Sequence, residues 1–264
     1  MYYSDSHTHT ILSMDGHVPL SILADAAIAA GLSALTVTDH YDFFTEDGKK
    51  APPLDWGPSL KQFRETAPRY AGKLDLHLGI EMGAGACFPQ EARAFLDQPE
   101  LDFVICSVHN MSPEKGGIDL FYLNFDRLED CYATLDDYFT SMAHLAPQSD
   151  LYDVMGHIIY PLRYMPDGVS LLGYKEVIDV ILKAVIQAGR GIEVNTCRGK
   201  TIGAWMSILS RYRALGGEIV TTGSDAHTVE GLGRGIAQAC DLLRETGFRY
   251  VAVYEKRKPV FHKL

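Results

Sequence analysis

Residues 21–40 read SILADAAIAAGLSALTVTDH, and within this short segment a helix-like run passes into a strand-like run. The helix-like part, Ser21–Ala30, begins with a capping serine, continues through an alanine-rich body and meets a stop signal at Gly31. The run Leu35–Thr38 then predicts a buried strand, and Asp39 and His40 follow it directly. The segment therefore predicts a helix that leads into a strand with functional side chains at its end.

The same alternation continues along the chain in both directions. Strand-like runs lie at Tyr2–Asp5, Leu35–Thr38, Asp75–Ile80, Phe103–Val108, Asp153–Met155, Gly191–Val194, Glu218–Thr222 and Tyr250–Tyr254. Further helix-like runs lie at Leu60–Tyr70, Leu135–Leu145, Gly173–Ala188, Trp205–Leu215 and Leu232–Thr246. Strands that alternate with helices indicate a parallel sheet with crossover helices, and seven or eight such units favour a closed α/β barrel of the TIM type. No linker or change of composition interrupts the chain, so we expect a single domain over residues 1–264.

The composition is that of a globular protein, with 47% hydrophobic and 22% charged residues and a net charge of -10. The negative charge argues against a basic surface that binds nucleic acid or a membrane. Five widely spaced cysteines without a CxxC pair, no signal-peptide pattern and no long apolar stretch predict a cytoplasmic protein. The sequence does not indicate the oligomeric state.

Residues able to bind a metal fall at the ends of the predicted strands. They are His7 and His9, His40, Glu81, His109, His157, and Asp225 with His227. Side chains at positions i and i+2 of a strand point to the same side, so His7 and His9 can reach one ion. The ends of parallel strands in a barrel meet at one rim. A single histidine after a strand is more often a satisfied polar residue than a ligand, but six histidines at such places favour a metal centre.

Imidazole and carboxylate ligands without cysteine suit zinc, iron or manganese. More candidate side chains are present than one ion can use, so we expect two or three divalent ions and hydrolytic chemistry. Such ions would also let a protein of net charge -10 hold an anionic substrate. His77, His144 and His262 are expected to be structural or solvated, whereas His17 is a candidate substrate contact in the same loop as Asp15.

The ordered set of motifs resembles the PHP (polymerase and histidinol phosphatase) superfamily. The motifs are His7-Thr8-His9, Thr38-Asp39-His40, Glu81, Ser107-Val108-His109, Gly156-His157, Glu193-Val194-Asn195 and Ser224-Asp225-Ala226-His227. The resemblance implies a distorted seven-stranded (β/α)7 barrel, in which Tyr250–Tyr254 is an accessory strand. It also implies a trinuclear site, with His7, His9, Glu81 and Asp225 on the first ion, Glu81, His109 and His157 on the second, and Asp15, His40 and His227 on the third. The Asp15 position varies in type across the family, and His17 is the alternative ligand.

The size of the chain and the context of its motifs resemble the monofunctional histidinol-phosphate phosphatases of that superfamily. This implies hydrolysis of a small phosphorylated metabolite, most directly L-histidinol phosphate, by a hydroxide held between metal ions, with His7, His9, Glu81, His109 and Asp225 as the catalytic set. Arg163 and Arg198 follow strand ends, and their guanidinium groups match phosphate oxygens, so we expect both to bind phosphate.

Three other functions remain open from the sequence. The same site could act on another phosphate ester or a nucleotide, because recognition of imidazole leaves no distinct sequence mark. A non-catalytic metal-binding module is a second alternative, which the complete ligand set disfavours. A metal-dependent amidohydrolase is a third, but such enzymes commonly place a carboxylated lysine at a strand end, where this chain has Glu81.

Overall fold

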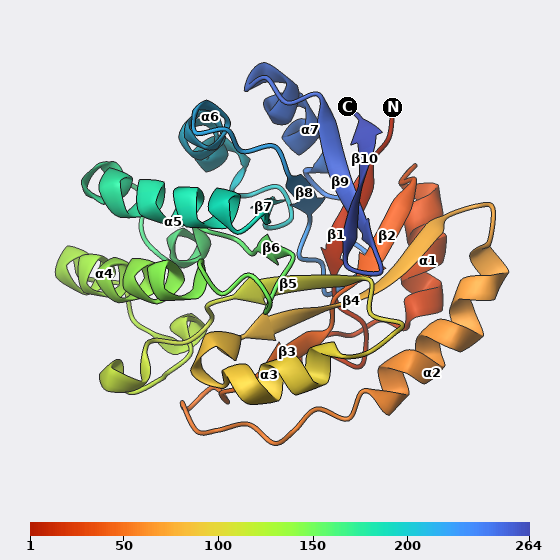
Figure 1. Ribbon diagram of the computed structural model, residues 1–264, viewed down its shortest axis with the longest axis horizontal. Helices are drawn as coiled ribbons and strands as arrows, with labels where there is room; N and C mark the ends of the chain where they lie inside the picture. Colours follow the sequence, from red (N-terminus) through yellow and green to blue (C-terminus); the bar gives the residue numbers. More distant parts are fainter.

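A computed structural model describes residues 1–264 and shows a barrel of parallel strands with helices around it (Figure 1). The strands of the barrel are β1 (Ser4–Thr8), β2 (Ala34–Val37), β4 (Asp75–Gly83), β5 (Phe103–Ser107), β6 (Val154–Met155), β7 (Gly191–Asn195) and β8 (Val220–Gly223), and they neighbour one another in this order. Every neighbouring pair in this order is parallel. A short additional strand, β3 (His40–Asp42), pairs with β4 near its carboxyl end.

The barrel is nearly closed where its first and last strands meet. The amide of Asp225 donates to the carbonyl of His7, and the amide of His9 donates to the carbonyl of Ala226, both at 2.9 Å. Thr8 and Ala226 thereby form a parallel bridge at the carboxyl ends of β1 and β8. The expected seven-stranded (β/α) barrel is confirmed, and its closure lies directly beneath the His7–His9 motif.

A hairpin of β9 (Tyr250–Glu255) and β10 (Lys258–Lys263) covers the opposite end of the barrel. The ring of Tyr254 stacks on Phe103 at the start of β5, and its hydroxyl donates to the carbonyl of Asp153 before β6. Arg257 at the tip of the hairpin forms an ion pair with the buried carboxylate of Asp153. The strand β9 pairs only with β10, so it is an accessory strand and not an eighth member of the barrel.

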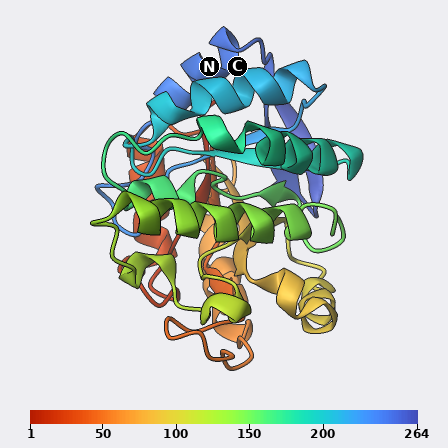
Figure 2. The ribbon, with the colours of Figure 1, turned by 90° about the vertical axis from the view of Figure 1, so that its left-hand side faces the viewer.

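Seven α-helices pack around the barrel wall, and Figure 2 shows several of them side by side. They are α1 (Leu20–Ala29), α2 (Gly57–Thr66), α3 (Pro89–Leu96), α4 (Leu128–Leu145), α5 (Lys175–Gln187), α6 (Trp205–Ala214) and α7 (Ile236–Glu245). Short 3₁₀ segments cover Ala67–Tyr70, Gly85–Cys87, Pro113–Lys115, Leu120–Tyr122, Tyr160–Arg163, Leu172–Tyr174 and Ile202–Ala204. None of the helices combines the length and the apolar composition needed to cross a bilayer.

Several predicted boundaries differ from the structure. Helix α1 is preceded by Pro19 without a side-chain cap, so the predicted cap by Ser21 is wrong. Helix α4 begins at Leu128 rather than Leu135, within the stretch expected to be a loop. Strands β3 and β10 and helix α3 have no counterpart in the prediction. Elements of three to eight residues present too few turns or alternations for a sequence period to be recognised.

Candidate metal centre

The predicted ligands converge on one cavity at the carboxyl ends of the barrel strands. The cavity has a volume of about 410 Å³, and its lining includes nearly all of the polar side chains predicted from the sequence. Those that line it are Asp15, His17, His40, Glu81, His109, His157, Arg163, Arg198, Asp225 and His227. His7 and His9 lie fully buried directly beneath it. The barrel therefore brings together side chains that are more than 200 residues apart in the sequence.

The first cluster joins the two histidines of β1 to two carboxylates. The Nε2 atoms of His7 and His9 are 3.1 Å apart, and Glu81 Oε2 lies 3.1 Å from the first and 3.5 Å from the second. Asp225 Oδ1 lies 3.6 Å from His7 and 3.4 Å from His9. The ligand atoms of His7, His9 and Glu81 therefore lie within 4.8 Å of one another, and Asp225 is next to both histidines.

The second cluster is built on the other oxygen of Glu81. Glu81 Oε1 lies 2.8 Å from His157 Nε2 and 3.0 Å from His109 Nε2, and the two imidazole nitrogens are 3.3 Å apart. Since each oxygen of Glu81 faces a different group of histidines, this carboxylate is placed to bridge two ions.

The third cluster combines Asp15 with His9, His40 and His227. Asp15 Oδ2 lies 2.9 Å from His227 Nε2, and Asp15 Oδ1 lies 3.6 Å from His40 Nε2. His17 lines the cavity but belongs to none of the clusters. The geometry thus favours Asp15 over His17 as the ligand, and leaves His17 available to substrate.

These separations fit metal binding better than ordinary hydrogen bonding. Ligands at about 2.0–2.1 Å from a tetrahedral zinc ion lie about 3.3 Å from one another. Most of the nitrogen and oxygen separations in the first two clusters fall near that value. In the third cluster, the buried Nε2 of His227 has no aligned hydrogen-bond partner although Asp15 is close by. An atom of this kind points its lone pair into the cluster, as a ligand must.

The charges of the clusters depend strongly on one another. Burial opposes the ionisation of Glu81, but the nearby His7, His109 and His40 hold its pKa well below the usual range. Burial lowers the pKa of His9 to about 3, with the neighbouring His40 contributing. His9 is therefore neutral near pH 7, which is the form of imidazole that binds metals.

Glu193 orients the His7 ring from behind and holds the backbone of His157. Its Oε1 lies 2.6 Å from His7 Nδ1, and its Oε2 accepts a hydrogen bond from the amide of His157 at 2.9 Å. Holding Nδ1 of His7 turns Nε2 toward the first cluster. Asp39, a second buried carboxylate that follows a strand, accepts hydrogen bonds from the amide and hydroxyl of Thr10 and touches no imidazole.

Two orienting residues were not predicted. Ser13 Oγ lies 3.0 Å from His9 Nδ1, and Asp42 Oδ1 lies 2.9 Å from His109 Nδ1. Asp42 stands two residues after His40 on β3, the same spacing that singled out His7 and His9. This spacing was the available signal, but β3 itself was not recognised as a strand.

Asp225 has an unusual backbone, with φ at +59°. A left-handed conformation costs a non-glycine residue roughly 1 kcal/mol, so the surroundings must hold it. The buried carboxylate of Asp5 does so by accepting hydrogen bonds from the amide and hydroxyl of Ser224 and from the amide of Gly233. Burial opposes the ionisation of Asp225, but the Arg163 guanidinium and His7 hold its pKa well below the usual range.

The two arginines expected to bind phosphate differ in their surroundings. Arg163 is 10% exposed, forms an ion pair with Asp225 Oδ2 at 2.7 Å and donates to Asn195 Oδ1 at 2.7 Å. Its guanidinium also stacks over the Tyr160 ring. Arg198 is exposed, lines the cavity and forms no ion pair. Phosphate binding stays a prediction for both, and Arg198 is the one whose charge is free.

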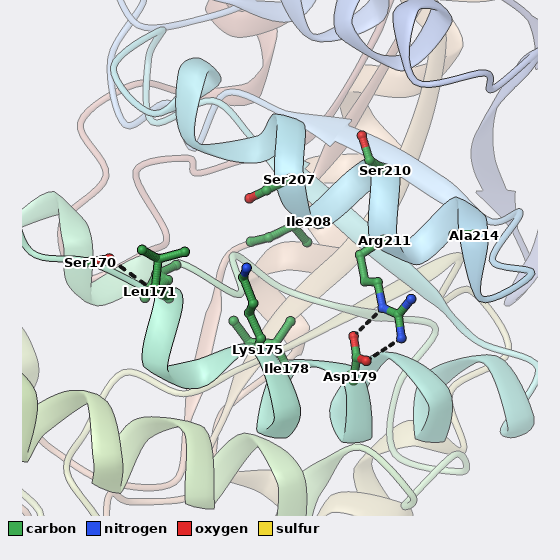
Figure 3. A pocket seen from close by; sticks show the side chains of 11 residues that line it. Ser170, Leu171, Lys175, Ile178, Asp179, Ser207, Ile208, Ser210, Arg211 and Ala214 are labelled. Atoms are coloured by element: carbon green, nitrogen blue, oxygen red, sulfur yellow. Dashed lines mark hydrogen bonds and ion pairs between the residues drawn. The ribbon is translucent and has the colours of Figure 1, made fainter.

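A larger groove of about 800 Å³ lies elsewhere, between α5 and α6 (Figure 3). Its lining includes Ile178 and Ile208 and the ion pair of Arg211 with Asp179, in which two hydrogen bonds join the side chains. None of the predicted site residues lines it. The chemistry is therefore placed in the smaller cavity at the strand ends.

Comparison with known proteins gives the same interpretation. A family model described as the PHP domain matches residues 5–197. A histidinol-phosphatase of Lactococcus lactis is 27% identical over 96% of this chain and 95% of its own, and a Clostridium acetobutylicum protein named as a probable histidinol-phosphatase is 28% identical over 96% and 97%. A crystal structure of the histidinol phosphate phosphatase from L. lactis, complexed with zinc, L-histidinol and phosphate, superposes with a TM-score of 0.85 at 26% identity, covering 98% of each chain. Because the family model matches most of this chain, the chain belongs to the PHP domain family.

Proposed function

We propose that this protein is a metal-dependent phosphatase that hydrolyses L-histidinol phosphate to L-histidinol and phosphate. The observation that carries the proposal is a single cavity that joins four overlapping groups of candidate metal ligands to an arginine without an ion-pair partner. The names of its relatives and the ligands of the L. lactis structure support the choice of substrate.

The three clusters would hold two or three divalent ions. His7, His9, Glu81 and Asp225 would hold one, Glu81 with His109 and His157 a second, and Asp15 with His40 and His227 a third. When bound, such ions supply a hydroxide near neutral pH and polarise the phosphoryl oxygens. The role of the protein is to fix the ligands, and the contacts of Glu193, Ser13 and Asp42 with the outer nitrogens of the histidines do this before any substrate arrives.

The phosphate would be positioned by Arg198, whose guanidinium lies at the cavity without a carboxylate partner. An arginine offers two parallel hydrogen bonds to a phosphate group. Arg163 lines the same cavity, but its fork is already engaged by Asp225 and Asn195. We therefore assign the principal phosphate contact to Arg198, and assign Arg163 to holding Asp225 in place.

The alcohol part of the substrate would lie against the acidic and aromatic side of the cavity. Glu46 and Asp119 line it, and neither forms an ion pair within the protein. Phe121 and Tyr122 are exposed beside them, and the Tyr122 hydroxyl donates to Glu46 at 2.6 Å. Carboxylates and aromatic faces together suit a cation, and L-histidinol carries an ammonium group.

The test is a comparison of phosphate esters with the protein loaded with zinc or manganese. We expect the kcat/KM for L-histidinol phosphate to exceed that for glucose 6-phosphate and AMP by about 100-fold or more, since esters without an ammonium group leave the carboxylates of Glu46 and Asp119 unpaired. Chelation should abolish the activity, and added metal should restore it. Equal rates on all esters would refute the substrate assignment, and preference for a nucleotide would establish the alternative named above. Undiminished turnover by Asp225→Ala after metal addition would refute the site.

A further inference from the structure

The strand β3 places a second carboxylate beside the metal clusters. It pairs with β4 in the register His40 to Glu81, Tyr41 to Met82 and Asp42 to Gly83. Because strand side chains alternate, His40 and Asp42 share one face of β3, and both line the cavity. Tyr41 points the other way and packs in the buried core.

Both oxygens of Asp42 face histidines from different elements. Oδ1 forms a hydrogen bond of 2.9 Å with His109 Nδ1. Oδ2 lies 3.2 Å from His40 Nδ1, an ion-pair contact without hydrogen-bond alignment, and Glu81 Oε2 lies at the same distance from that nitrogen. The carboxylate is 10% exposed and has no lysine or arginine partner. Its two histidine contacts are therefore its only ion pairs.

The opposite nitrogens of these two histidines belong to different clusters. His109 Nε2 faces Glu81 and His157 in the second cluster. His40 Nε2 faces Asp15 in the third. One carboxylate thus contacts the outer nitrogen of a ligand in each of two neighbouring clusters.

The space for this carboxylate exists because residue 83 is a glycine. A Cβ at Gly83 would lie 1.6 Å from Asp42 Oδ1 and 3.2 Å from His109 Nδ1. The backbone of Gly83 does not have the positive φ that favours glycine, so the requirement is one of space and not of conformation. Any larger side chain there would push Asp42 away from His109.

We infer that Asp42 is a positioning residue that orients His40 and His109 together, in the space left by Gly83, and so sets the affinity of two of the three metal clusters at once. A carboxylate that holds one nitrogen of an imidazole fixes the ring and turns the lone pair of the other nitrogen to the metal. The first cluster shares Glu81 with the second and His9 with the third, but His7 and His9 take Glu193 and Ser13, not Asp42, as partners of their outer nitrogens. The inference rests on the proposed metal centre.

The test is zinc affinity, measured on metal-free protein by competition with a chromophoric chelator, together with the metal content per chain. Asp42→Asn should weaken binding by about 10–100-fold at the ions held by His40 and His109, because orienting partners contribute about that much. The first ion should keep its affinity. The matched control is Asp102→Asn at the opposite end of the barrel, where the carboxylate accepts bonds from the amides of Leu78 and Lys256. We expect the control to lose stability but to keep its zinc affinity.

A double-mutant cycle separates orientation from general damage. Gly83→Ala keeps every ionisable group, yet should weaken the same two ions by displacing Asp42. In an Asp42→Ala background, Gly83→Ala should change affinity by less than about twofold, because the displaced carboxylate is gone. If Asp42→Asn does not fold, as judged by thermal unfolding of the metal-free form, the cycle with Gly83 carries the test.

Three results would overturn the inference. The first is a zinc affinity of Asp42→Asn within about twofold of that of the original protein. The second is a loss of zinc affinity in Asp102→Asn as large as that in Asp42→Asn. The third is an undiminished effect of Gly83→Ala on zinc affinity in the Asp42→Ala background. Failure of the unaltered protein to bind zinc would instead refute the proposed metal centre. The two failures are therefore distinguishable in the same assay.

Discussion

Replacement of Arg163 by glutamine removes the guanidinium that faces the carboxylate of Asp225. The two side chains are 10% and 8% exposed, and their charged atoms are 2.7 Å apart. Removing one member of a buried pair costs about 3–5 kcal/mol, because the other charge stays buried without its partner. Asp225 keeps His7 and His9 within 3.6 Å, so we expect the lower end, about 3 kcal/mol, in metal-free protein.

A loss of this size lowers the melting temperature of a chain of this length by about 6 °C. Thermal unfolding followed by circular dichroism measures it, with and without zinc. Zinc should reduce the difference between Arg163→Gln and the unaltered protein, because an ion bound to Asp225 takes over part of the lost charge compensation. The expected effect of zinc distinguishes a residue that holds a ligand from one that only packs.

The control is Arg211→Gln on the surface between α5 and α6. Arg211 also forms two hydrogen bonds with an aspartate, Asp179, but its side chain is 48% exposed. An exposed pair contributes about 1 kcal/mol or less, equivalent to about 2 °C here. Equal melting temperatures for the two variants would refute the argument from burial. A raised KM for phosphate esters at unchanged stability would instead make Arg163 a phosphate contact, as the sequence predicted.

Three further predictions concern the substrate and the metals. Arg198→Ala should raise KM for L-histidinol phosphate by about 10-fold or more at an unchanged melting temperature, because its free charge binds phosphate; an unaltered KM would contradict this. Asp119→Asn combined with Glu46→Gln should lower kcat/KM for L-histidinol phosphate while sparing a neutral ester such as phenyl phosphate, and equal losses on both would refute an ammonium contact. Burial would lower the pKa values of His7, His40 and His109, but neighbouring carboxylates raise them well above the usual value. The neighbouring carboxylates thus keep protons on these rings in the metal-free protein, so zinc binding should release protons and tighten as the pH rises. Calorimetry in two buffers that shows no proton release would contradict it.

The barrel was predictable because its strands are uniformly buried and end in polar residues. The runs Leu35–Thr38 and Gly191–Val194 are short, rich in β-branched residues and alternate apolar with polar positions, and they lie within one residue of β2 and β7. Helix α4 was misjudged at its beginning because Leu128 starts a segment rich in charged residues, where tertiary packing decides the boundary. Of the C-terminal hairpin, only β9 was predicted, because β10 is largely exposed and lacks a clear alternation of apolar and polar residues.

The convergence of the candidate ligands on one cavity was predictable from their positions in the sequence, but the contacts behind them were not. His7, His109 and Asp225 lie at or just after the carboxyl ends of strands that any barrel brings to one rim. The role of Asp42 depends on a three-residue strand and on a glycine 41 residues later, and no local pattern connects the two. The ion pair of Arg163 with Asp225 likewise depends on the exact course of a loop, which the sequence predicts only as irregular.

The charge of the cavity explains why a phosphatase of this design needs its ions before its substrate. Six carboxylates line the cavity, those of Asp15, Asp42, Glu46, Glu81, Asp119 and Asp225, against the two guanidinium groups of Arg163 and Arg198. In the metal-free protein, protonated His40 and His109 offset only part of this negative charge. Each divalent ion that displaces a proton adds positive charge where the phosphate must lie. We therefore expect a dianionic ester to be repelled until the ligand clusters are filled, so that metal binding precedes substrate binding.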